Sequence, residues 1–186
     1  DEGDTVSLIL EREESIMVSA TFEHLPVEKQ SRIRQALLNE FSHYPLADAQ
    51  VARIVKDANI ARGAFYKYFD DLTDAYRYLF GVAMVEIHRT MPNRPTLDNI
   101  DEYVDSIRKF ILEADEAGYR QLIKLHYQYN EGFLGRRPTT IPSDADSAKE
   151  WAITALYHQT VRDVVLDPES MDEPIKQLRV VLQNVK

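Results

Sequence analysis

The chain has 186 residues, of which 44% are hydrophobic and 28% are charged, a balance typical of an ordinary globular domain. It has no cysteine, which excludes disulfides, thiolate metal sites and cysteine nucleophiles. Its formal net charge of −9 argues against a protein that coats nucleic acid without specificity.

The charge is distributed unevenly along the chain. Residues 1–26 hold seven acidic residues and one arginine, a net charge of −6, and residues 92–186 hold sixteen acidic and twelve basic residues, a net charge of −4. Residues 27–91 hold nine basic and eight acidic residues, a net charge of +1. Within that segment, residues 51–68 hold four basic residues against one acidic residue, a net charge of +3. This pattern leaves room for one local cationic face.

We interpret residues 1–20 as an acidic N-terminal leader or arm, either partly ordered or containing a short amphipathic helix. Met17 leaves open whether residues 1–16 belong to the native protein. The stretch TVSLIL at 5–10 is the one place where a strand is conceivable. Elsewhere apolar residues recur at spacings of three and four, which predicts an all-α protein.

Three helices are predicted between Pro26 and residue 70. The first ends before Pro45, and one of its faces carries Ile33, Ala36, Leu37, Glu40 and Phe41. The second covers about 48–58 with Asp48 as its N-cap, and the third covers about 61–69. Asn59 lies at the turn between them, where Asn tolerates the left-handed backbone conformation. Two short helices joined by a tight turn after a longer helix form the helix-turn-helix plan, whose second short helix enters the DNA major groove.

The third helix divides into two faces. Phe65 and Phe69 are four residues apart and should point into a small core. The pair Arg62 and Tyr66 and the pair formed by Gly63 and Lys67 share another face. One interpretation assigns no function to this segment and regards it as an amphipathic helix with a solvated basic face.

The functional interpretation gives that second face a chemistry suited to DNA. Arg62 could contact guanine edges or phosphate, Lys67 and the Tyr66 hydroxyl could contact phosphate, and Ala64 could contact a thymine methyl. Gly63 costs roughly 1 kcal/mol in a helix, which is easiest to understand where a ligand or another backbone approaches closely.

The remaining chain is also expected to be helical. Asp70 and Asp71 can cap a helix to about Met91. Further helices are predicted at about 96–117 (from Thr96 to the break at Gly118), from there to Leu134, from a capping box at Ser143 and Asp146 through Leu166, and at about 172–185.

Two sets of residues in this part suggest a ligand pocket and a dimer surface. Aromatic side chains that could line an apolar pocket are Tyr103, Phe110, Tyr127, Phe133, Trp151 and Tyr157. Apolar residues of the last two helices that could face a second subunit are Leu156, Val161, Val164, Val165, Leu178, Val181 and Leu182. Each could equally be ordinary core.

The order of residue types around the predicted turn is specific. It reads Ile54-Val55, Ala58-Asn59-Ile60-Ala61, Arg62-Gly63 and Phe65-Tyr66-Lys67-Tyr68-Phe69. Residues 21–80, about a third of the chain, thereby resemble the N-terminal domain of the TetR (tetracycline-repressor-like) family of bacterial transcription regulators.

This resemblance implies a helix-turn-helix DNA-binding domain at 21–70 and a helical ligand-sensing and dimerisation domain at 71–186. It implies a homodimer that binds a near-palindromic double-stranded operator and responds to an unknown small apolar or aromatic effector. The residues expected to face DNA are Gln50, Arg62, Gly63, Ala64, Tyr66, Lys67 and Tyr68.

Three departures from the family pattern keep an alternative open. Ala61 replaces the usual serine cap, Asn59 the usual glycine, and Leu72 a usual lysine. With Asp71 beside Leu72, we expect weaker and more salt-sensitive DNA binding. The alternative hypothesis is a protein of this fold in which DNA binding is lost or weak and which binds small molecules or proteins.

Other classes find little support in the sequence. It has no GxSxG, P-loop, GxGxxG or HExxH motif, so we expect no enzyme, and we place no metal and no cofactor. No apolar run reaches the roughly 18 residues of a membrane span and no signal peptide is visible, so a cytoplasmic protein without a membrane partner is expected.

Overall fold

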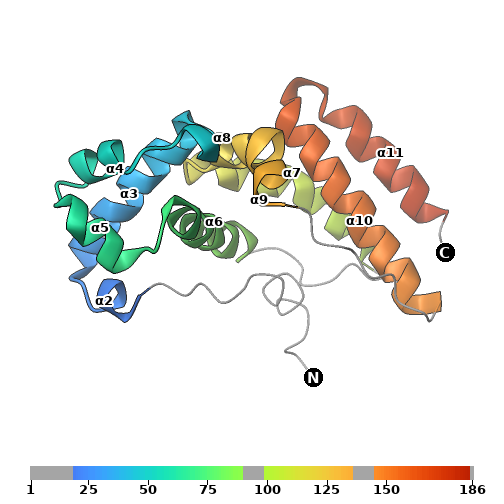
Figure 1. Ribbon diagram of the computed structural model, residues 1–186. Helices are drawn as coiled ribbons and strands as arrows, with labels where there is room; N and C mark the ends of the chain where they lie inside the picture. The colour runs from blue at the N-terminus through green and yellow to red at the C-terminus, as the bar shows by residue number, and fades with distance from the viewer. Residues whose placement is uncertain (1–18, 90–98, 136–144, 185–186) are drawn as a thin grey trace. The chain divides into compact units, whose positions relative to one another are not determined.

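The computed structural model describes residues 19–89, 99–135 and 145–184, and all regular structure in these ranges is helical (Figure 1). The predicted all-α class is thereby confirmed for the described chain. The predictions that concern residues 1–18, Thr96 and Ser143 lie outside these ranges.

The helices follow one another with short connections. In chain order they are α2 (Ala20–Glu23), α3 (Val27–His43), η1 (Leu46–Asp48), α4 (Val51–Asp57), α5 (Arg62–Tyr68), α6 (Leu72–His88), α7 (Ile100–Glu116), α8 (Arg120–Leu125), η2 (His126–Asn130), α9 (Glu131–Leu134), α10 (Ala145–Leu166), η3 (Pro168–Ser170) and α11 (Asp172–Gln183). η1 and η3 are single 3₁₀ turns, whereas η2 is a π-helical turn between α8 and α9.

Three local features differ from the prediction. α4 begins at Val51 because the chain first makes the η1 turn and then becomes extended at Ala49 and Gln50. Asp48 is therefore not its N-cap. Gln50 takes that position without a side-chain hydrogen bond. The pattern of spacings also did not reveal α2 or the π-helical turn η2.

The chain forms two compact units. The first unit combines Asp1–Glu86 with Gln121–Gly135, and the second combines Ile87–Arg120 with Arg136–Lys186. These boundaries differ from the functional division drawn at residue 70, which remains a prediction about roles.

The core of the first unit is rich in aromatic rings. The predicted inner face of α3 is buried along its length, including the acidic Glu40. Phe65 of α5 packs 5.4 Å from Phe69, whose ring lies 5.4 Å from Phe22 of α2. Such ring pairs contribute beyond their buried area, so these contacts fix α5 on the rest of the unit.

The turn between α4 and α5 has the geometry expected of Asn59. Its φ of 50° places it in the left-handed region. The Ile60 N–H donates to the Val55 carbonyl at 3.0 Å, and the Asn59 N–H donates to the Lys56 carbonyl at 3.3 Å. These two bonds form a Schellman motif, which satisfies the last carbonyls of α4 and redirects the chain into α5.

The acidic residues after α5 cap α6. Asp71 Oδ1 accepts the Asp74 N–H at 2.8 Å, and Asp74 Oδ2 accepts the Asp70 N–H at 2.9 Å. The prediction of a cap at this position is confirmed for Asp71. These carboxylates also lie at the positive end of the helix dipole, which favours their charge.

The second unit is built on α7, α10 and α11, which contact one another. α10 and α11 run side by side in Figure 1. Arg179 of α11 bridges Asp101 and Asp105 on α7, with an Nη2 to Asp105 Oδ1 distance of 2.6 Å. These ion pairs lie at the surface, where such pairs contribute little to the free energy of unfolding. Their role is to match the facing sides of α7 and α11.

Candidate nucleic-acid interface

The two predicted faces of α5 are confirmed by burial. Phe65 is fully buried and Phe69 nearly so, whereas Arg62, Tyr66 and Lys67 are exposed. Half of the Tyr66 surface is accessible although its ring lies only 5.3 Å from that of Phe65. One face of α5 therefore holds the unit together, and the other presents an arginine, a lysine and a phenol to solvent.

Tyr68 does not belong to the exposed face on which it was expected. Its side chain is only 5% exposed, and its ring packs edge-on against Phe22 at 5.7 Å. The Lys29 ammonium lies 5.9 Å from the ring centroid on another side. Since α2 and α3 cover the ring, Tyr68 is primarily a core residue.

The α2 segment supports the C-terminal end of α5. The Ser19 hydroxyl donates to the Lys67 carbonyl at 2.8 Å and also accepts the Phe22 N–H at 3.3 Å. Sequence reasoning assigned Ser19 to the leader and missed this support. The signal that could have found it is a serine three residues before a phenylalanine, the N-cap position of a short helix.

A buried carboxylate positions the start of α4. Glu40 Oε1 accepts the Gln50 N–H at 2.7 Å, and Arg53 Nε donates to Glu40 Oε2 at 2.9 Å. The Arg53 guanidinium also lies 3.8 Å over the Tyr44 ring and donates to the Asp48 carbonyl at 2.8 Å. The hydrogen bond to Glu40 raises the pKa of Arg53 above its ordinary value. This network holds Gln50, the one expected DNA contact outside α5, at the exposed entry of α4.

Replacing Glu40 with alanine should lower the free energy of unfolding by about 2 kcal/mol, because the Gln50 N–H loses its acceptor. Glu40→Gln keeps an acceptor of the same length and should lose clearly less. Urea unfolding followed by far-UV circular dichroism measures both variants. Equal losses in the two variants would show that the Gln50 bond is not what Glu40 supplies.

The N-terminus of α5 lacks a side-chain cap. Ala61 occupies the N-cap position and offers no acceptor, as expected from its departure from the family serine. The Ala64 N–H is satisfied by the Ala61 carbonyl at 2.9 Å. The helix start thus relies on its backbone and on the packing of Phe65.

Gly63 lies on the exposed face with open space around it. A Cβ added there would meet no heavy atom within 4 Å among the described residues. Packing inside the chain therefore does not explain a glycine at this helical position.

The aromatic residues expected to line a pocket are divided between the two units. Tyr103, Phe110 and Tyr157 are buried in the second unit, where the rings of Tyr103 and Tyr157 lie 4.2 Å apart. Burial raises the pKa of both phenols, and the Tyr157 hydroxyl lies 2.9 Å from Ser106 Oγ.

The other three expected pocket residues divide between the units. Trp151 is half-buried in the second unit, whereas Tyr127 and Phe133 belong to the first unit. A ligand pocket lined by these six residues therefore stays a prediction.

The residues expected at a dimer surface also divide. Five are buried within the chain, namely Val161, Val164, Val165, Leu178 and Leu182. Leu156 of α10 and Val181 of α11 are 41% and 45% exposed, and Val180 beside Val181 is exposed as well. These exposed side chains are the ones available to a second subunit.

Over the described ranges, no group of three or more His, Cys, Asp or Glu side chains that could hold a metal ion occurs. None of the helices in these ranges is long and apolar enough to cross a membrane.

Solved structures similar to this chain include a member of the TetR family. No protein-family model matches the chain, and no curated protein matches its sequence. The structure is similar to the crystal structure of a TetR family transcriptional regulator from Chloroflexus aurantiacus J-10-fl, with 20% sequence identity and a TM-score of 0.44. The alignment covers 90% of this chain and 97% of that chain.

Proposed function

We propose that the chain is a DNA-binding transcription regulator of the TetR type, whose α5 enters the major groove. The observation that carries this proposal is the division of α5, in which Phe65 is buried while Arg62, Tyr66 and Lys67 are exposed. α5 follows α4 through the Schellman turn at Asn59, which supports the geometry of a helix-turn-helix. Arginine suits guanine edges, and lysine and a phenol suit phosphates.

A homodimer completes the proposal. Operators read by such helices are near-palindromic, and their half-sites lie about 34 Å apart, so two copies of α5 must be presented together. The exposed apolar side chains Leu156, Val180 and Val181 on α10 and α11 supply a surface for the second copy.

Regulation would follow from a shift in population. An effector that binds the second unit better in one conformation favours that conformation. The spacing of the two DNA-binding domains in the dimer then no longer fits successive major grooves. We propose that the chain acts as a repressor and that its effector is an apolar or aromatic compound. We also propose that it acts in the cytoplasm.

A mobility-shift titration tests the proposal. The full chain is titrated against a fragment from upstream of its own gene and against operators selected from a random pool, over a range of salt concentrations. The expected result is a saturable complex containing two chains per fragment, whose affinity falls steeply with salt. Absence of a specific complex at low salt would reject DNA binding and favour the second candidate.

That second candidate is a protein of the same fold that binds small molecules or proteins. The observations that favour it are Ala61, which leaves α5 without a side-chain cap, and the carboxylates of Asp70 and Asp71 next to α5. Carboxylates beside a phosphate backbone repel it.

Gly63 offers a variant in which stability and binding should move in opposite directions. Gly63→Ala should raise the free energy of unfolding by up to about 1 kcal/mol, because the site is helical and spacious. It should weaken DNA binding, because the added methyl group occupies the space that a DNA backbone would use. Thermal unfolding and the mobility shift measure the two effects.

A matched control is Gly132→Ala in α9, where a Cβ would also meet nothing within 4 Å. It should change stability in the same direction and leave DNA binding unaltered. Unchanged DNA affinity in Gly63→Ala would contradict a close approach of DNA at this residue.

A further inference from the structure

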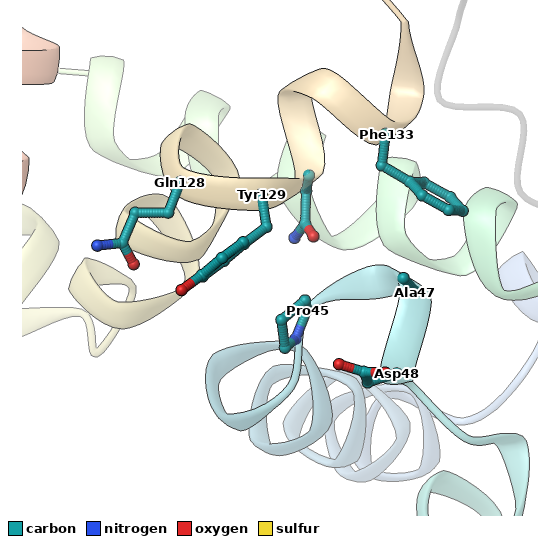
Figure 2. Close-up of a pocket in the computed structure, with 7 residues that line it drawn as sticks. Pro45, Ala47, Asp48, Gln128, Tyr129 and Phe133 are labelled. Atoms are coloured by element: carbon teal, nitrogen blue, oxygen red, sulfur yellow. The ribbon is translucent and has the colours of Figure 1, made fainter.

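A groove in the first unit plays no part in the proposed DNA contact. Its volume is about 520 Å³, within the range of small-molecule sites. Figure 2 shows Tyr129 and Phe133 on one side of the groove and Pro45, Ala47 and Asp48 on the other. Gln128 and Asn130 complete the lining.

A buried hydrogen bond joins the two walls. The Leu46 N–H on the η1 wall donates to Asn130 Oδ1 on the η2 wall at 2.8 Å, and both side chains are buried. A buried amide that satisfies a backbone group holds its surroundings in one arrangement. π-helical turns such as η2 occur frequently at functional sites. The two walls of the groove are thus tied together by a buried hydrogen bond.

The η2–α9 wall exposes two large aromatic rings. Tyr129 is 54% exposed and Phe133 is 57% exposed, and the two residues are four positions apart. Aromatic side chains line many ligand-binding sites. The faces of such rings carry partial negative charge and attract cations.

The other wall also favours a cation, because it carries a carboxylate. Asp48 is exposed, and no Lys, Arg or His is among the lining residues. Arg53 contacts the Asp48 carbonyl, and its guanidinium is held by Glu40 in a 2.6 Å ion pair. Asp48 is thus the one acidic side chain among the residues that line the groove.

We propose that this groove binds an aromatic organic cation, with its ring against Phe133 and its positive charge toward Asp48. The exposed ring selects a flat aromatic compound, and the carboxylate selects a cation over a neutral or anionic compound of the same shape. Of the lining residues, Phe133 was also expected to line the ligand pocket, and occupation of the groove does not depend on DNA binding.

The test is a fluorescence titration of the full chain with N-methylacridinium at about 0.15 M salt. Neutral acridine, at a pH where it is uncharged, has the same rings without the charge. The expected result is saturable binding of one cation per chain, with acridine bound about tenfold more weakly. Phe133→Ala and Asp48→Asn should each weaken the cation about fivefold, whereas Tyr129→Phe, which keeps the ring, should not.

Controls separate the groove from the general negative charge of the chain. Glu116→Gln removes an exposed carboxylate from the second unit and should leave the cation affinity unchanged. An equal loss in Glu116→Gln and Asp48→Asn, or unchanged affinity in Phe133→Ala, would overturn the proposal, as would acridine bound as tightly as the cation. Far-UV circular dichroism verifies that the exposed substitutions leave the fold intact.

Discussion

Replacing Arg62 with alanine is expected to weaken operator binding by roughly tenfold to a hundredfold. A bidentate arginine–guanine pair contributes about 1–3 kcal/mol of discrimination, and a dimer makes one such pair in each half-site. Arg62→Lys keeps the charge but not the planar fork, so it should recover only part of the affinity. The mobility-shift titration on specific and scrambled fragments measures both variants, and the effect should be greater on the specific fragment.

Lys67 provides the matching test of phosphate binding. Lys67→Ala should weaken binding to all sequences and reduce the slope of log affinity against log salt by about 1 for each phosphate that is no longer neutralised. Lys176→Ala removes an exposed lysine from α11 in the second unit and should change neither. If Arg62→Ala, Lys67→Ala and Lys176→Ala all bind alike, α5 does not contact DNA.

The second large effect is expected at Phe65. Phe65→Ala should lower the free energy of unfolding by about 3–5 kcal/mol, because the ring is fully buried and packs on Phe69. Tyr66→Ala, one residue later, should change it by about 0.5 kcal/mol, since half of that side chain is exposed. Tyr66→Ala should nevertheless weaken DNA binding strongly.

Far-UV circular dichroism during urea unfolding measures the pair. The only tryptophan, Trp151, belongs to the second unit, so its fluorescence reports on a different part of the chain. Similar stability losses for Phe65→Ala and Tyr66→Ala would show that the two faces of α5 are not energetically distinct.

Local patterns in the sequence were sufficient to predict the longer helices and the turn at Asn59. Helical spacing placed the buried face of α3 and the division of α5, because both depend on residues three and four apart. Asn59 indicated the left-handed turn through its own backbone preference. The acidic start of α6 indicated a cap for the same local reason.

Features that depend on tertiary neighbours could not be predicted. Glu40 lies on an otherwise apolar face, and only the fold brings the Gln50 N–H and Arg53 to it. Tyr68 was expected on the exposed face of α5, but in the fold α2 covers its ring. The hydrogen bond beneath the groove joins Leu46 to Asn130, which are 84 positions apart in the sequence. No rule of helical spacing relates residues at that separation.

The apolar residues of α10 and α11 show the same limit. The sequence identifies them as apolar, but not which neighbour covers each of them. Val164 and Leu182 are covered within the chain, whereas Leu156 and Val181 are not.

The cap that Asp71 provides to the Asp74 N–H constrains how this chain could evolve toward tighter DNA binding. Exchanging Asp71 for a basic residue would remove a repulsive charge near the proposed interface, but it would also remove the acceptor that holds the Asp74 N–H. The loss of such a cap costs about 1 kcal/mol. A lineage would therefore need a compensating substitution in α6 first, or would reach higher affinity by changing α5 itself. At the start of α6, a substitution of Asp71 therefore changes the surface charge and the stability of the helix at the same time.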